Sequence, residues 1–171
     1  LLKGPSEQKL KGSEEWSRAA NGMAVKAGHT GRTLTVSNPV LHFADVRKVK
    51  LLPNTEGSVE VFSIINGGPP IGHRVGRVRV VNGAIDFDVT KAPAPNIWEF
   101  MTKDNLIAIH GTSGAIQSYA TDGETTVNIL EGEATAAHAG VNEQTGAAEL
   151  YLFTVLGGIA LTIPHDGMGE E

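Results

Sequence analysis

Residues 74–89 read RVGRVRVVNGAIDFDV, and this stretch decides the fold class. Polar and apolar residues alternate along 77–80 and again along 84–89, which is the two-residue period of a β-strand. The apolar residues of "AIDFDV" therefore face a predicted core, and the two aspartates between them face water. Asn82-Gly83, which separates the two runs, is the strongest hairpin signal in the chain. The stretch thus predicts two antiparallel strands joined by a two-residue turn.

The same period of two continues from residue 40 toward the C-terminus. Turn-forming segments such as PNTEG, NGGPPIG, TDGE and GG separate the apolar runs. Many short strands with no long helical window indicate an all-β, antiparallel sandwich or barrel. The predicted strands are 40–44, 47–52, 59–65, 74–81, 84–89, 97–102, 106–110, 115–121, 125–131, 148–156 and 159–163.

A different pattern precedes this body. Ser13 and the two glutamates after it favour the start of a helix. Its apolar stripe consists of Trp16, Ala19, Ala20 and Met23. Asn21-Gly22 supplies a left-handed stop. A stripe this thin cannot stabilise an isolated helix, so we expect it to pack on something else.

Two strand-like runs follow the predicted helix, at 23–27 and 32–37, and GHTG between them suits a tight hairpin loop. The sequence therefore predicts an N-terminal segment over 1–38, made of an extended arm, a short helix and a hairpin. A β-rich body follows over 39–171. The segment KAPAPN at 91–96 is either an internal boundary of that body or a long sandwich loop.

Composition excludes several classes of function. The net charge of −5 argues against a nucleic-acid partner, because a duplex binder needs a basic stripe to displace counterions. The chain has no cysteine, which removes disulfides and thiolate metal sites. No apolar run is long enough to cross a bilayer, so no membrane association is expected.

No motif for catalysis, metal or cofactor stands out. The six histidines show no pair at the close spacing of a preformed metal site. In HGTSGA, Ser113 has glycine two positions before it but alanine two positions after it, and a strand follows where a nucleophile elbow needs a helix. We interpret HGTSGA as a turn between two strands and expect a protein that is not an enzyme and holds no cofactor or metal.

Aromatic residues make up only 5% of the chain, and the core needs most of them. A glycan-binding module would instead show aromatic rings on its surface. Trp98, together with Arg77 and Arg79 on one face of another predicted strand, is the candidate ligand surface if the protein binds a carbohydrate.

The N-terminal stretch EEWSRAANGMAVKAGHTGRTLTVS, residues 14–37, carries a resemblance to a known group of proteins. Its pattern W-x-x-A-A-N-G-(apolar)-x-V-x-x-G, then a polar turn and RTLTV, resembles the N-terminal segment of small virion proteins of tailed bacteriophages and related particles. The resemblance covers about a seventh of the chain. Met23 after Asn21-Gly22 and His29 in the turn depart from the pattern.

The resemblance implies a structural role in the virion, as a capsid decoration, spike or fibre subunit. Its N-terminal segment would attach to capsid or other virion proteins while the β-body projects outward. Such a thin unit would be completed by sister chains, so we expect a homotrimer. The residues expected to be buried between the three chains are Trp16, Ala20, Met23, Val25 and Leu34. The alternative is a carbohydrate-binding β-sandwich, which could recognise host glycans; a small hydrolase comes third, with no motif behind it.

Overall fold

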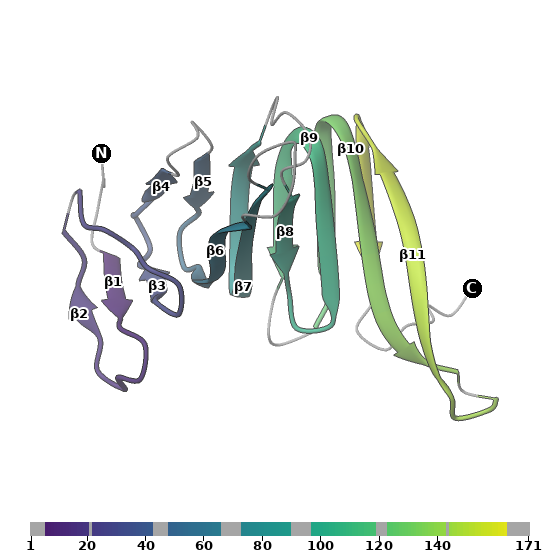
Figure 1. The fold of residues 1–171 in the computed structure, drawn as a ribbon, viewed down its shortest axis with the longest axis horizontal. Coiled ribbons are helices and arrows are strands. Elements are labelled where there is room, and N and C mark those ends of the chain that lie inside the picture. Colours follow the sequence, from purple (N-terminus) through teal and green to yellow (C-terminus); the bar gives the residue numbers. More distant parts are fainter. Residues whose placement is uncertain are drawn as a thin grey trace.

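A computed structural model describes residues 6–20, 22–42, 48–65, 73–89, 97–118, 123–142 and 144–163, and all regular secondary structure among them is β (Figure 1). The all-β prediction is therefore confirmed. The strands are β1 (Ser6–Lys9), β2 (Ser17–Arg18), β3 (Thr30–Thr33), β4 (Val40–His42), β5 (Lys48–Leu51), β6 (Glu56–Ile65), β7 (His73–Asp88), β8 (Ile97–Met101), β9 (Asn105–Ser118), β10 (Thr125–Val141), β11 (Ala148–Leu156) and β12 (Ile159–Ile163).

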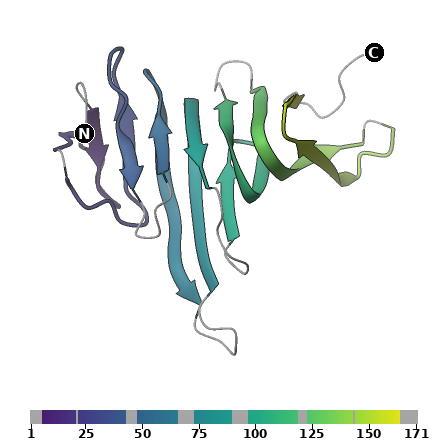
Figure 2. The ribbon, with the colours of Figure 1, turned by 90° about the horizontal axis from the view of Figure 1, so that it is seen from above.

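The twelve strands form one continuous sheet that folds over on itself. Its main path runs β11-β10-β9-β8-β7-β6-β3-β1-β2, while β12 pairs with β10 and the pair β4–β5 joins β7 (Figures 1 and 2). The sheet closes because β7 pairs with β8 along its first half and with β9 along its second, and β8 also pairs with β9. The result is a closed barrel core from which β1–β3 extend at one end and β11 at the other.

Closure depends on three long strands that bend and so belong to two layers. The first part of β7, the first part of β9 and the last part of β10 lie in one layer with β6, β8 and β11. The remaining parts of these three strands lie in the other layer with β5 and β12. The register of β10 shifts twice between Ile129 and Glu133, which is the irregularity that a strand needs to turn such a corner.

The predicted hairpin at Asn82-Gly83 is wrong, because β7 runs through it without reversing. A type I′ turn needs positive φ at both central residues, and only Gly83 has it, at 99°. Thr55 bonds to the backbone of β7 directly after this glycine. Its hydroxyl donates to the carbonyl oxygen of Ala84 at 2.9 Å and accepts from the amide of Ala84 at 3.0 Å. Gly83 is thus the corner between the two layers.

The predicted turn HGTSGA is also wrong, since residues 105–118 form one strand. Gly114 serves a close backbone approach, because a Cβ at this position would clash with the carbonyl oxygen of Asn128. The strand predicted at 125–131 is confirmed but extends ten residues further, to Val141. The predicted strands 148–156 and 159–163 have the bounds of β11 and β12.

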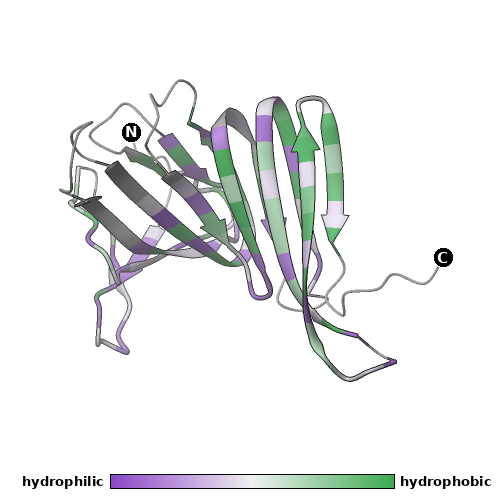
Figure 3. Cartoon of the chain, turned by 45° about the vertical axis from the view of Figure 1, so that its right-hand side comes forward, coloured by the Kyte–Doolittle hydropathy of each residue, from purple (hydrophilic) through white to green (hydrophobic). Residues whose placement is uncertain are grey.

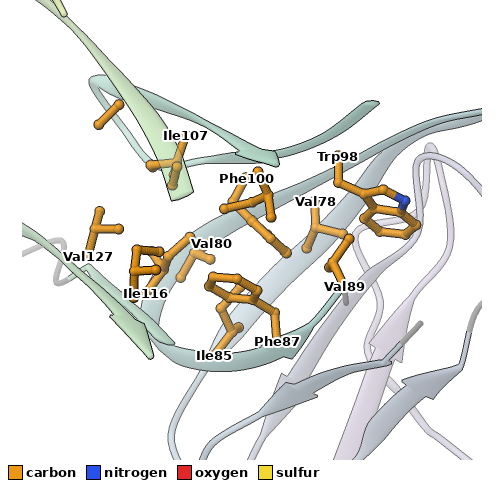
Figure 4. Close-up of a cluster of buried hydrophobic side chains, with 14 of the residues drawn as sticks. Val78, Val80, Ile85, Phe87, Val89, Trp98, Phe100, Ile107, Ile116 and Val127 are labelled. Carbon is orange, nitrogen blue, oxygen red and sulfur yellow. The ribbon is translucent and has the colours of Figure 1, made fainter. Parts of the chain in front are cut away.

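The core lies between the two layers and combines side chains from both halves of the chain (Figure 4). Ile85, Phe87 and Val89 are buried in it, as their alternation predicts, and Phe87 packs against Phe100 with a centroid distance of 4.8 Å. Residues 91–96 lie outside the described part of the chain. The strands that flank them, β7 and β8, pair in parallel and share this core.

The predicted N-terminal helix does not form. Residues 17 and 18 are β2, which pairs with β1, and the amide of Ala19 donates to the carbonyl oxygen of Ser6 at 2.9 Å. The Ser13 hydroxyl does accept from the amide of Glu15 at 3.1 Å, but the turn is not continued. The extended backbone gains a partner strand, which an apolar stripe of one tryptophan and two alanines cannot match.

The predicted hairpin of 23–27 with 32–37 is wrong as well. Residues 23–27 are not a strand, and β3 pairs instead with β1 on one side and β6 on the other. The Thr33 hydroxyl donates to the carbonyl oxygen of Leu52 at 2.5 Å and accepts from the amide of Thr55 at 2.8 Å. Distant partners in the body therefore determine the position of β3.

Candidate protein-binding surface

All five residues predicted to be buried between chains lie outside the strands of this chain. Trp16 is half-buried, with Lys9 Nζ 5.1 Å and Arg32 Cζ 4.2 Å from its ring centroid. Ala20, Val25 and Leu34 are exposed, and Met23 is half-buried. Without a helix the common stripe is lost, and Trp16 instead stacks between cations of its own chain.

Trp98, Arg77 and Arg79 do not form one surface. Trp98 is only 1% exposed, because it pairs with Gly76 and so faces the core, whereas the two arginines alternate to the outer face. Arg77 Nε lies 2.8 Å from Glu99 Oε2, and Arg79 Nε lies 3.2 Å from Glu60 Oε1. A tryptophan in the core cannot stack on a sugar, so the carbohydrate-binding alternative loses its aromatic platform.

Among the described residues, no group of three histidine, aspartate or glutamate side chains is arranged to hold a metal ion. His110 is exposed and lies 3.2 Å from the Thr135 hydroxyl, while His138 is buried. Ser113 lies within β9, opposite Asp88 of β7 and Glu131 of β10. His110 precedes Ser113 by three residues on β9, whereas His138 pairs with Asn105 at the start of that strand.

An apolar row crosses the outer face of one layer. Met101 of β8 lies opposite Leu106 of β9, Leu106 opposite Ala137 of β10, and Ala137 opposite Leu152 of β11. Residues directly opposite one another in a ladder point to the same side of the sheet. We call these four residues the apolar row; Arg79 ends it on the β7 side, with its Nη2 3.8 Å from Met101 Sδ.

The row becomes most exposed at β11, the last strand of the sheet. Leu150 and Leu152 are both 66% exposed on one side of β11, and Leu156 follows on that side at 54%. The opposite side carries Phe153, which is 37% exposed. Figure 3 shows that the strands nearest the C-terminus are predominantly hydrophobic along their length. Apolar groups are thus exposed on both faces of this strand.

Sequence reasoning missed this surface, although a signal for it exists. An antiparallel strand with one solvated face should alternate between apolar and polar residues. In AELYLFTVL, residues 148–156, the alternation fails because leucines occupy one side while tyrosine, phenylalanine and valine occupy the other. Such a strand, apolar on both sides yet at the end of a sheet, indicates a surface that another molecule covers.

A buried polar cluster holds the inner side of the same strands in place. His138 Nδ1 lies 2.8 Å from Asn105 Oδ1, and the Asn105 amide donates to the hydroxyls of Thr102 at 3.2 Å and Thr125 at 2.9 Å. Because the Asn105 amide nitrogen is used as a donor, its oxygen accepts, and His138 carries its proton on Nδ1. His138 Nε2 has no hydrogen-bond partner. This cluster links β9 and β10 to Thr102, the residue that follows β8, behind the apolar row.

Polar side chains also stabilise the turn between β10 and β11. Glu149 accepts from the Tyr151 hydroxyl at 2.7 Å and from the Asn142 amide at 2.8 Å. Both bonds hold the pKa of Glu149 below its usual value, and the bond from Tyr151 has the larger effect. The bond between Tyr151 and Glu149 also raises the pKa of Tyr151. The single charged group of β11 is therefore bound to its own hairpin.

Comparisons with known proteins support the fold and nothing finer. No family model matches the chain, and no curated protein matches it. Two crystal structures of a proposed anti-sigma factor from Parabacteroides distasonis ATCC 8503, at 2.50 Å and 1.65 Å resolution, are similar in structure, with TM-scores of 0.53 and 0.50. Each is 12% identical over 81% of this chain, and the chain spans only 60% of their length. At this identity the likeness concerns the fold alone.

Within the described ranges, no helix combines the length and apolar character that crossing a membrane requires.

Proposed function

We propose that this chain is a non-catalytic protein-interaction domain that binds a protein partner through the apolar row and the exposed leucines of β11. The observation that carries the proposal is the run of apolar side chains across four adjacent strands. It ends in Leu150 and Leu152, two-thirds exposed. Contiguous apolar surface on a folded domain is typical of protein interfaces.

The shape of the surface favours a protein over a small ligand. The row lies on the outer side of a sheet whose inner side is filled by the core and the His138 cluster. Small molecules bind in concave pockets that enclose most of their surface, whereas a flat apolar sheet face suits another sheet or an amphipathic helix. The rigid support behind the row also lowers the entropy lost on binding.

The structural neighbour offers a model for what such binding does. An anti-sigma factor acts by binding a protein, and this fold occurs in one proposed to be such a factor. We therefore propose that the present chain is a regulatory protein-binding domain of the same kind. Because it spans 60% of that protein, the regions beyond the match are outside the comparison.

Direct binding to the sigma factors of its own genome tests this function. The decisive variant is Ala137→Lys, which puts a long cation in the middle of the apolar row. The matched control is Ala20→Lys, at an exposed alanine far from the row. We expect isothermal titration to show a weaker affinity for Ala137→Lys by roughly tenfold or more, equivalent to about 1.4 kcal/mol, and no change for Ala20→Lys. Equal affinities, or no bound sigma factor, would reject the proposal.

A structural role in a virion is the second candidate. It rests on the resemblance of residues 14–37, and the place of β1–β3 at one end of the sheet leaves that segment accessible to a particle. The helix on which the resemblance partly depends does not form. Deleting residues 1–20 should then abolish co-sedimentation with purified particles while leaving the core intact. Retained attachment would count against this role.

A further inference from the structure

We infer that β11 pairs with β11 of a second copy of this chain, which makes a two-fold dimer whose sheets join edge to edge. The inference rests on the proposed function in one respect, since it names a partner for the same apolar end of the molecule. It concerns the edge of β11, however, whereas the proposed regulatory partner lies on the face of the sheet.

The edge of β11 has none of the features that prevent two sheet edges from pairing with each other. All nine of its residues pair with β10 in unbroken register, so no bulge twists the strand away. It contains no proline and no glycine. Its one charge, Glu149, is bonded to Tyr151 and Asn142 of its own hairpin. No other described strand pairs with β11. An edge of this kind is a template for another strand.

Charge placement favours a second copy in antiparallel orientation. One register pairs all nine residues, with Leu152 on the two-fold axis and Ala148 opposite Leu156 of the second copy. In that register the two copies of Glu149 are separated by six residues along the ladder, about 20 Å. This exceeds the screening length of about 8–10 Å in physiological salt, so they do not repel. Parallel in-register pairing would instead put them side by side.

Side-chain chemistry in this register is self-complementary. A two-fold axis perpendicular to the sheet keeps the leucine side of both copies on one face. The apolar row then continues through Leu152 into Leu152 of the second copy and doubles in length. On the other face, Tyr151 lies opposite Phe153, an aromatic pair of the kind that stabilises antiparallel strands.

The size of the interface sets the expected strength. A ladder of nine residues is about 30 Å long and one strand deep. That is small beside a standard interface, which buries about 800 Å² on each partner. We therefore expect a dimer that dissociates on dilution, in contrast to the trimer inferred from the N-terminal segment.

Sedimentation velocity of the whole chain over a broad concentration range tests the inference. We expect the average mass to rise toward twice the monomer mass. Leu150→Lys should weaken the association, because Leu150 faces Thr154 of the second copy. Adding Thr154→Glu should restore it, because each lysine then faces a glutamate. Val36→Lys, at a side chain 70% exposed and remote from β11, is the matched control and should leave the mass unchanged.

Amide exchange supplies a second measurement that does not depend on variants. The backbone amides of β11 should exchange more slowly at high than at low protein concentration, and those of β1 should not change. A monomer at every concentration, a trimer, or a double variant as weak as Leu150→Lys would overturn the inference. A dimer that binds no sigma factor would refute the proposed function only, and a monomer that binds one would refute the dimer only.

Discussion

Single residues decide where this sheet can turn and how closely its strands can approach. Gly83 adopts a φ of 99°, and Thr55 bonds both polar groups of the adjacent Ala84. Gly76 serves another purpose. Because it has no side chain, it leaves room for the Trp98 ring directly above its Cα. A Cβ at Gly76 would lie 2.8–2.9 Å from three atoms of the indole. One residue thus permits a bend and the other permits a buried tryptophan.

Gly76→Ala should destabilise the protein because the added methyl group forces Trp98 out of its position. Overpacking of this kind costs about 1–3 kcal/mol. Chemical denaturation followed by tryptophan fluorescence measures the loss. Gly31→Ala is the control, since a Cβ there would meet only the carbonyl oxygen of Glu7 at 3.9 Å. Equal stabilities of the two variants would contradict the packing argument.

Thr55→Val keeps the shape of the side chain but removes the hydroxyl that bonds to Ala84. The amide of Ala84 then loses this partner, whereas its carbonyl oxygen keeps the bond from the amide of Leu52 at 2.9 Å. We expect a loss of about 1–3 kcal/mol in the free energy of unfolding. Thr126→Val provides the comparison, because its hydroxyl pairs with that of Thr162 on the exposed surface. Unfolding in urea should show a much smaller loss of stability for Thr126→Val. If Thr126→Val lost more stability than Thr55→Val, the bonds from Thr55 to Ala84 would not stabilise the bend.

Pairs of strands are stabilised by cross-strand polar contacts as well as by the ladder. On the outer face of β6 and β7, the Ser58 hydroxyl donates to Glu60 at 2.5 Å and Arg79 lies 3.2 Å from the same oxygen. The bond from Ser58 is the main cause that lowers the pKa of Glu60, partial burial opposes it, and the charge of Arg79 adds to it. The charged form is therefore favoured in the folded state.

The stabilisation from Glu60 should depend on pH in a defined direction. Because folding lowers its pKa from 4.5, the contribution is complete above that value and disappears as the pH falls through the folded pKa. Glu60 is partly exposed, so we expect less than about 1 kcal/mol. The difference in unfolding free energy between wild type and Glu60→Gln, measured from pH 7 downward, should shrink in acid. In a Ser58→Ala background, the loss of unfolding free energy caused by Glu60→Gln should be smaller. If that loss grew in acid, the lowered pKa of Glu60 would be contradicted.

Whole strands were predicted with uneven success, for a physical reason. Strands rich in valine, isoleucine and aromatic residues, such as β11 and β12, stand out from the sequence. The second half of β10, EATAAHAGV, does not, because alanine and glycine have low β-propensity. Its position comes from its neighbours: β11 pairs with all nine residues on one side, and β9 pairs with residues 133–138 on the other. Small residues suit a strand confined between two others.

The molecule as a whole has a closed core with two different ends. At one end β1–β3 attach through the pairing of β3 with β6, and at the other β11 exposes its leucines. The buried apolar core begins at Val49 and includes nothing from the first twenty residues. The N-terminal strands are therefore an extension of the sheet and not part of the core.

Deletion of residues 1–20 should accordingly leave a folded domain. We expect cooperative unfolding to persist, because β3 keeps its pairing with β6 and Thr33 keeps its bonds to Leu52 and Thr55. The deletion also removes Trp16, so the fluorescence reports Trp98 alone, which is 1% exposed. A blue-shifted emission and a β-type circular dichroism spectrum would confirm an intact core. Emission at the wavelength of solvated tryptophan would show that the N-terminal strands are required.

The sequence by itself determined the fold class, most of the strands and the burial of alternate residues such as Ile85 and Phe87, because a period of two is a local property of the chain. Tertiary structure decided whether the chain reverses at a glycine or only bends there. Gly83 and Gly114 both lie within continuous strands because strands far away in sequence pair with them. It also decided that residues 13–20 are extended, and that Trp98 is core while Leu152 is surface. These outcomes depend on which strands become neighbours, and a single segment does not contain that information.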